Sequence, residues 1–547
     1  MSTQLQFPGE SFFVRNATGL VRELSAFHAF AFNASFINIG LMLIFMFLYA
    51  PSFHPGSNMV LATLAATVLA IPMGFVNGML ASIFPRSGGE YVYNSRVISP
   101  AVGFAANFNI SVWLMFYVGV SCVLFAQHGV AATLRFVGVK WDWGASIAAA
   151  TWVAMPIGSF CIGTITLIGI LVMLIFGTRR MAQAQTIYFV LGLVGVACAV
   201  GLLTGLRSDE YEHLFDDYFT KAVSNQATLS NSVTEASAKG YTSGEFSLMN
   251  TALIFFWPAN FLFWGNCSTY FGGEVQYARR SQIFANVGAI VLSGLTVALA
   301  VAVYNRTVGV ERIGAITYLQ SAGAGFGFAP TYAELAAAVA PSWIGLFVLI
   351  ACAYWPISFA PLIIGACTRN FLAWSMDRVA PEVFSRVSPR FHTPIPALIA
   401  CGVVGEISVV LYAFVPAFAF AVGIVGAFIT FMVTALSATI LPMRRKEILQ
   451  RSPVNWRIAG YPVITLVGAL ALIGLAAVQI SVLSDPFSGV SLFPSTDAGN
   501  GPVIPFIMLL VNLAILATGF LVYGLARRVK KAQGIDLSLA FKEIPPE

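Results

Sequence analysis

Long apolar runs limit how this chain can fold more than any other feature of its sequence. Runs of about twenty residues recur along it, and as a helix each is long enough to cross about 30 Å of hydrocarbon. Hydrophobic residues make up 58% of the chain and charged residues only 10%, whereas an ordinary soluble domain is about one quarter charged. Because a helix satisfies its own backbone polar groups in lipid, the sequence predicts an all-α polytopic membrane protein.

The apolar runs predict about twelve membrane-spanning helices. They are expected at Phe27–Ala50, Met59–Ile83, Pro100–Phe125, Ile157–Phe176, Ala182–Leu206, Leu248–Phe271, Ile283–Val303, Trp343–Ala366, Ile395–Ala413, Ala417–Leu441, Tyr461–Val482 and Val503–Tyr523. The apolar stretch Trp143–Met155 is too short to span and is predicted to be interfacial or re-entrant. The polar stretch Arg207–Phe246 is predicted to be a partly ordered surface loop.

Positive charge indicates the orientation of these spans. With the N-terminus inside, most of the 29 Lys and Arg residues fall in cytoplasmic segments, as the positive-inside rule requires. The chain is therefore expected in the plasma membrane with both termini cytoplasmic. The predicted divisions are a tail at 1–24, a membrane core at 25–445 holding spans one to ten, spans eleven and twelve at 446–528, and a tail at 529–547. The net charge of +6 suits an anionic inner leaflet, and nothing indicates nucleic-acid binding.

Two spans are interrupted by residues that form helices poorly. The first carries Asn-Ala-Ser-Phe-Ile-Asn-Ile-Gly at 33–40, and the sixth carries Pro258, the polar and glycine-containing stretch 263–269, and the Gly-Gly pair 272–273. A break in mid-membrane survives only where it lines protein or a cavity. If the first ten spans form two five-helix repeats, these breaks correspond and indicate a central binding site. The alternative is that the small residues serve close helix packing.

The two breaks supply the candidate substrate-binding residues. These are Ser35, Phe36, Asn38, Ile39, Gly40, Phe263, Trp264, Gly265 and Asn266. Neither break holds a charged side chain, so a charged ligand would be met by half-helix ends, which provide both signs. Free N–H groups after Asn38 suit a carboxylate and carbonyls ending the first halves suit an ammonium, a pair of charges that an α-amino acid carries.

Loop motifs resemble those of the amino acid, polyamine and organocation permease family. The segment 84–93, Phe-Pro-Arg-Ser-Gly-Gly-Glu-Tyr-Val-Tyr, which leads to Arg96, is similar to its loop between spans two and three. Segments 273–280, 368–371, 376–381 and 393–396 resemble its cytoplasmic segments after spans six and eight, although the usual proline is absent from the first.

This resemblance, which covers about the first 445 residues, implies a five-plus-five inverted-repeat fold of the leucine-transporter type. It further implies alternating access, a substrate held between broken helices one and six, and an aromatic residue beside the sixth break that closes over the substrate. The family commonly has a glycine where Asn38 stands. Asn tolerates unusual backbone angles and adds a polar side chain.

Charged residues in the loop motifs are expected to form a cytoplasmic gate. They are Arg86, Glu90, Glu274, Arg369 and Asp377. Ion pairs that exist in only one access state would bias the transport equilibrium. The alternative is that each residue anchors a helix end at the headgroups.

The sequence leaves the driving ion open between sodium, proton and none. A sodium site between helices one and eight would use carbonyls near Ile37 and the hydroxyl of Ser358, while the lysine that proton-coupled relatives carry in span five is absent here. Glu406 is the one carboxylate placed deep in a span, and a structural hydrogen bond is favoured for it over a proton relay. His28 is expected to cap or pack near the cytoplasmic end. Neither a metal site nor a cofactor is expected.

The sequence therefore predicts a secondary active transporter that moves neutral amino acids. An enzyme is not expected because the histidines are scattered and only Glu406 lies in mid-span. Two alternatives stay open: a transporter of another small amine or solute, such as a polyamine or nucleobase, and a non-transporting solute receptor. The expected partners are the small-molecule substrate and the lipid bilayer, and the oligomeric state is left open.

Overall fold

The fold is given by a computed structural model. It describes residues 22–222, 228–321, 330–388, 390–391, 393–415, 423–493, 503–537 and 541. Most of the predicted N-terminal tail, the first residues of the predicted tenth span and most of the C-terminal tail beyond 537 lie outside the described residues.

Eleven helices of the described chain are long and apolar enough to cross a membrane. They are α1–α2 (Ala26–Ile37 and Ile39–Phe53), α3 (Met59–Ile83), α5 (Pro100–Leu124), α8 (Pro156–Ile175), α9 (Thr178–Thr204), α15 (Ala278–Tyr304), α18 (Ser342–Met376), α19 (Ile395–Phe414), α20 (Ile424–Arg444), α22 (Val463–Ser484) and α23 (Val503–Ala532). The sixth predicted span is split into α12 (Leu248–Leu253), α13 (Phe256–Leu262) and α14 (Cys267–Tyr270), so no piece of it is long enough alone. The predicted all-α membrane architecture is confirmed.

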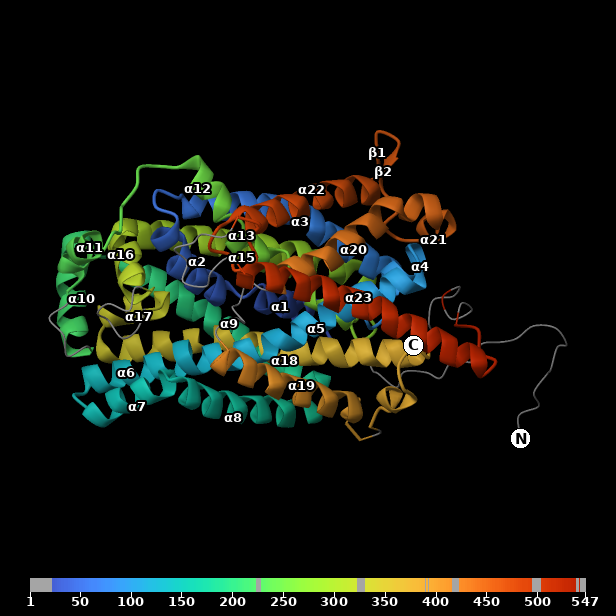
Figure 1. Cartoon of the computed structure of the whole chain (residues 1–547), viewed down its shortest axis with the longest axis horizontal. Coiled ribbons are helices and arrows are strands. Elements are labelled where there is room, and N and C mark those ends of the chain that lie inside the picture. Colours follow the sequence, from blue (N-terminus) through green and yellow to red (C-terminus); the bar gives the residue numbers. More distant parts are fainter. Residues whose placement is uncertain are drawn as a thin grey trace.

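Shorter elements gather at the two ends of the bundle (Figure 1). One end carries α4 (Glu90–Val97), α21 (Lys446–Gln450) and the hairpin β1–β2 (Arg457–Ile458 and Tyr461–Pro462); we call it the α4 end. The other, the α10 end, carries α6 (Ala131–Lys140), α10 (Ser208–Ala222), α11 (Leu229–Ala238), α16 (Val310–Ser321) and α17 (Tyr332–Ala338). The π-helical turns η1 (Phe125–Val130) and η2 (Asn305–Gly309) continue α5 into α6 and α15 into α16, and η3 (Glu382–Ser385) follows α18. The helix α7 (Gly144–Ala154) is too short to span, as predicted.

Helix contacts occur in the pairs that two inverted five-helix repeats require. The second and seventh spans, α3 and α15, pack together, as do the third and eighth, α5 and α18. The first span contacts the seventh (α1 with α15), and the sixth correspondingly contacts the second (α13 with α3). In the same way, the fourth span contacts the third (α8 with α5) and the ninth contacts the eighth (α19 with α18). The last two spans lie outside this core. The helix α22 packs against both α3 and α20, whereas α23 packs against α5.

The described part of the predicted loop Arg207–Phe246 contains two helices, α10 and α11, which the prediction of a partly ordered loop did not specify. In α10 the residues Tyr211, Phe215, Tyr218 and Phe219 are buried, a spacing typical of an amphipathic helix. The hydroxyl of Tyr218 donates to the carboxylate of Glu334 at 3.2 Å and thereby ties α10 to α17. The sequence already contained this spacing, but the Ser- and Thr-rich residues that follow it favoured the prediction of a loop.

A glycine sets the distance between the third and ninth spans. A methyl group on Gly119 of α5 would overlap backbone atoms of Ser408 and Val409 in α19. At the same level the hydroxyl of Ser408 donates to the carbonyl of Phe116. Small residues let membrane helices approach this closely.

We expect Gly119→Ala to lower the thermal stability of the purified protein. Overpacking of a filled interface costs about 1–3 kcal/mol, and backbone atoms of α19 cannot move as a side chain can. Gly169→Ala in α8 is the matched control, because a methyl there meets nothing within 4 Å. An equal melting temperature for the two variants would show that this contact does not set the α5–α19 distance.

Candidate functional site

The first break is a single residue wide. Asn38 adopts left-handed backbone angles, φ 63° and ψ 74°, between α1 and α2, a conformation that Asn reaches more readily than most residues. Its Oδ1 accepts a hydrogen bond from the N–H of Leu41 at 3.0 Å and caps α2. Its Nδ2 donates to the carbonyl of Trp355 at 2.7 Å and to Oγ of Ser358 at 3.2 Å. The break is thereby fastened to α18.

The second break faces the first. It consists of the turn from Phe263 to Asn266 between α13 and α14. The N–H of Ser268 in α14 donates to Oδ1 of Asn33 in α1 at 2.7 Å. A methyl on Gly265 would lie 3.3 Å from Cδ1 of Ile37. The structure therefore brings together the two interruptions that the sequence paired.

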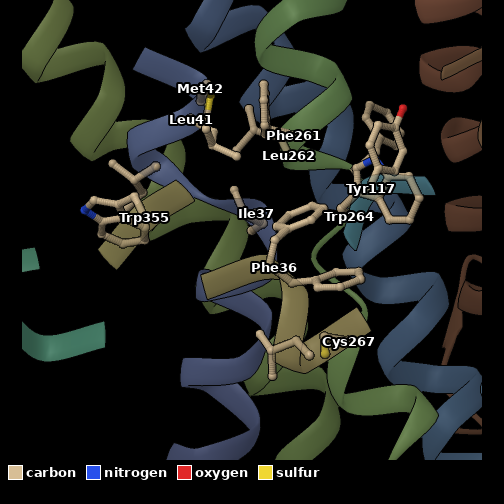
Figure 2. Close-up of a cluster of buried hydrophobic side chains, with 14 of the residues drawn as sticks. Phe36, Ile37, Leu41, Met42, Tyr117, Phe261, Leu262, Trp264, Cys267 and Trp355 are labelled. Carbon is tan, nitrogen blue, oxygen red and sulfur yellow. The ribbon is translucent and has the colours of Figure 1, made fainter. Parts of the chain in front are cut away.

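Aromatic rings fill the space beside the facing breaks (Figure 2). Phe36 stacks on Phe359 of α18 with ring centroids 4.9 Å apart. Trp264 meets Phe36 at 5.7 Å, Tyr117 of α5 at 6.1 Å and Phe431 of α20 at 5.0 Å. Trp264 is only 2% exposed and Phe36 is fully buried, so these rings pack against one another and not against solvent.

Two buried amide atoms at the breaks lack a hydrogen-bond partner among the described residues. They are Nδ2 of Asn33 and Oδ1 of Asn266. A buried donor or acceptor left without a partner costs about 1–3 kcal/mol. One free donor and one free acceptor beside an apolar cluster are chemically suited to a small ligand that carries both an anionic and a cationic group.

The other predicted binding residues divide between the breaks and α18. Ser35 faces α18, where its hydroxyl lies 2.9 Å from that of Tyr354. Gly40 also faces α18, because a methyl on it would overlap Cβ and Cγ of Trp355. Ile39 is buried as the first residue of α2.

Phe263 lies apart from the other predicted residues. Its ring packs against Phe428 of α20 at 5.7 Å, and its tip lies 3.0 Å from where a methyl on Gly474 of α22 would be. Of the two neighbouring aromatic residues, only Trp264 faces the breaks.

Sequence reasoning missed several residues that surround the breaks. They are Asn33, Tyr117, Trp355, Phe359 and Phe431. Asn33 lay inside the polar cluster that marked the first break and could have been found there. The aromatic residues come from spans three, eight and ten, where nothing in the sequence shows which side of each helix faces inward.

A buried ion pair joins the sixth and eighth spans at the α4 end. Arg369 of α18 donates from Nε to Oε1 of Glu274 at 2.9 Å and from Nη2 to Oε2 at 3.0 Å. The hydroxyl of Thr178 donates to the same carboxylate at 2.8 Å. The guanidinium also lies over the ring of Phe271, 4.7 Å from its centroid. Two parallel hydrogen bonds of this kind fix both distance and orientation.

A second buried ion pair joins α18 to α4. Arg96 donates from Nη2 to both carboxylate oxygens of Asp377, at 3.0 and 2.8 Å, and the hydroxyl of Tyr91 donates to Oδ2 at 2.8 Å. Arg96 was identified with the loop motif but not as a gate residue. Arg86, which was predicted to be a gate residue, donates to the carbonyl of Pro85 at 3.2 Å.

Backbone pairing closes the same end. The N–H of Leu24 donates to the carbonyl of Glu274 at 2.9 Å, and the N–H of Gln276 donates back to the carbonyl of Leu24 at 2.7 Å. The N–H of Gly88 donates to the carbonyl of Tyr270 at 3.0 Å. The segment 270–276, which we call the strap, is therefore held between the residues before α1 and the loop before α4.

Glu90 of α4 is a buried carboxyl within this closed end. Its Oε1 accepts from Nδ2 of Asn107 at 2.9 Å and from the hydroxyl of Tyr270 at 3.0 Å, while Oε2 lacks a partner among the described residues. Burial raises the pKa of Glu90 to about 7, against the opposing effect of its hydrogen bonds.

The two further residues singled out in the sequence have local partners. The hydroxyl of Thr164 in α8 donates to Glu406 at 2.7 Å, which is the structural hydrogen bond favoured above. His28 caps α1 together with Ser25, through the N–H of each residue and the side chain of the other.

We expect Glu274→Gln to destabilise this closed arrangement strongly, because it leaves the Arg369 guanidinium buried without its anion, a change that costs about 3–5 kcal/mol. The measurement is thermal unfolding of Glu274→Gln, Arg369→Gln and the double variant. The double variant is expected to lose less than the sum of the singles. Glu235→Gln, which breaks an exposed pair with Lys239, is the control and should change little. Additive losses would contradict a direct pairing.

The raised pKa of Glu90 predicts a pH dependence. Since the folded carboxyl holds its proton up to about pH 7 and the unfolded one only to about pH 4.5, stability falls as pH rises through this window and levels off above it. The melting temperature should drop by a few °C between pH 5 and 8, and Glu90→Gln should flatten the drop. The exposed Glu447→Gln serves as control; an unchanged slope in Glu90→Gln would contradict the assignment.

The comparisons with known proteins agree with this geometry. The family model described as amino acid permease matches residues 30–522. Among curated proteins no significant match is found. A solved structure described as MhsT in complex with L-phenylalanine is similar in fold, with a TM-score of 0.55 at 15% identity, covering 83% of this chain and 98% of that one.

The family match begins within α1 and ends within α23, and it extends over both breaks and both ion pairs of the α4 end. It includes Asn38, Trp264, Glu274 and Arg369. The chain therefore belongs to the amino acid permease family.

Proposed function

We propose that this permease binds one neutral amino acid between the facing breaks and carries it across the membrane by alternating access. The observation that carries the proposal is the juxtaposition of two broken helices around buried polar atoms of Asn33 and Asn266 that lack a partner among the described residues. In this region the described side chains are apolar or uncharged, so no fixed charge selects for a cationic or anionic side chain of the substrate.

Each part of a neutral amino acid has a candidate partner. The N–H groups of Ile39 and Gly40 begin α2 after the break, and the start of a helix favours a carboxylate. The free Oδ1 of Asn266 suits the ammonium group. Phe36, Tyr117 and Trp264 would contact an apolar side chain, the kind of lining that small-molecule sites commonly have.

We further propose that the α4 end faces the cytoplasm of a cell whose plasma membrane holds the protein, with both termini on that side. Arg86, Arg96, Arg369 and Arg445 lie in this part of the chain, as expected for positive charge retained inside. The Glu274–Arg369 and Arg96–Asp377 pairs, with Glu90, would then form the cytoplasmic gate. Opening toward the cytoplasm would require both pairs to separate.

Binding can be tested with the purified protein in detergent. A thermal-shift screen of the twenty amino acids, a diamine and nucleobases should show saturable stabilisation by neutral amino acids with apolar side chains. Counterflow in proteoliposomes, in which preloaded substrate accelerates uptake, then separates a transporter from a receptor. Stabilisation by the diamine or a nucleobase alone would contradict the proposed substrate class.

Two neighbouring aromatic residues provide a matched pair of variants for the site. Trp264→Ala should weaken binding about tenfold or more, since large aromatic contacts dominate such sites. Phe263→Ala removes an equally buried ring that faces α20 and α22 and should lower the melting temperature while leaving the dissociation constant within about threefold. Equal effects on affinity would place the substrate elsewhere.

A further inference from the structure

The corner where the first break meets α18 contains the oxygen atoms that a sodium site between helices one and eight would use. The carbonyls of Ser35 and Trp355 and the hydroxyl of Ser358 converge there, and Oγ of Ser358 lies 3.2 Å from the first and 2.9 Å from the second. Ser35 and Ser358 are fully buried. A hard cation is bound by the lone pairs of just such oxygens.

A protein nitrogen already points at these lone pairs. Nδ2 of Asn38 donates to the Trp355 carbonyl at 2.7 Å and to the Ser358 hydroxyl at 3.2 Å. The orientation of the amide is fixed chemically, because the other amide atom faces the N–H of Leu41, a donor that only an oxygen can satisfy. Both hydrogens of the amide are thus directed at the oxygens that would otherwise face a cation.

A second amide supports the same corner from the fifth span. Nε2 of Gln185 in α9 donates to the carbonyl of Ser358 at 2.9 Å, and the hydroxyl of Tyr354 links the backbone of Gln185 to the side chain of Ser35. The described residues of this corner therefore include two neutral amides and no anion. A sodium ion does not fit among them, since N–H groups and a cation compete for the same lone pairs.

We infer that the side-chain amide of Asn38 takes the place of a bound sodium ion between the first and eighth spans, so that this permease binds its substrate without sodium. The amide holds the break against α18 permanently, whereas an ion would do so only when bound. The left-handed backbone at residue 38 admits few side chains, and Asn is one that combines this conformation with a donor group.

The inference depends on the proposed function for its substrate, but the sodium site can be tested without one. Asn38→Asp keeps an oxygen for the N–H of Leu41 and turns the amide nitrogen into a second oxygen facing Trp355 and Ser358. Without a cation these oxygens repel, so the variant should melt several °C below the wild type in potassium or choline chloride. Sodium at the same ionic strength should restore a large part of that loss, because a ligand stabilises the form that binds it.

Two controls accompany this experiment. The wild type should melt at the same temperature in all three salts. Asn33→Asp makes the same chemical change in the same helix but at a side chain whose oxygen contacts Ser268 of α14, and it should show no selective response to sodium. If Asn38→Asp does not fold, Asn38→Gly keeps the left-handed backbone, removes the amide and should show a sodium response of its own.

A saturable stabilisation of the wild type by sodium would overturn the inference, as would folded Asn38 variants that ignore sodium. The amino acid affinity of the wild type should agree within about twofold between sodium and choline media; a sodium-dependent affinity would also overturn it. Absence of amino acid binding in every salt would instead reject the proposed function, while the response of Asn38→Asp would still test the site.

Discussion

Backbone groups exposed by a helix break must find partners when the break lies inside a membrane, and two asparagine side chains in the first span meet this requirement here. Asn38 supplies the acceptor that begins α2, and Asn33 supplies the acceptor for the N–H of Ser268 in the other broken helix. The first break is thus fastened to α18 and the second to α1. The aromatic cluster, the unpartnered amide atoms and the proposed sodium substitute all depend on these contacts.

The eighth span connects the breaks to the closed end of the bundle. It is a single helix of 35 residues, α18, that holds Trp355 and Ser358 beside the first break and Arg369 near the α4 end, where Asp377 caps it. The sixth span provides a shorter route, because α14 begins one residue after Asn266 and ends at Tyr270, whose hydroxyl contacts Glu90. A ligand that repositions Asn266 would therefore act on Glu90 and the α4 end through about one helical turn.

Much of the fold and part of the site could be predicted from the sequence. Apolar length fixed the spans, poor helix formers marked both breaks, and the loop motifs identified charged residues that the structure gathers at one end. The choice of ion-pair partners could not be predicted, because it depends on how each helix is rotated about its axis. The same limit applies to the turn between α13 and α14, where Trp264 faces the breaks and its neighbour Phe263 does not.

The strap has a mechanical consequence for transport. Its backbone is paired with Leu24, only two residues before α1 begins, through hydrogen bonds in both directions. The halves of the first and sixth spans that lie nearest the α4 end, α1 and α14, are therefore linked through this pairing. Neither half can move outward alone without breaking it. An opening of this end that keeps the pairing would therefore have to move α1 and α14 together as one unit.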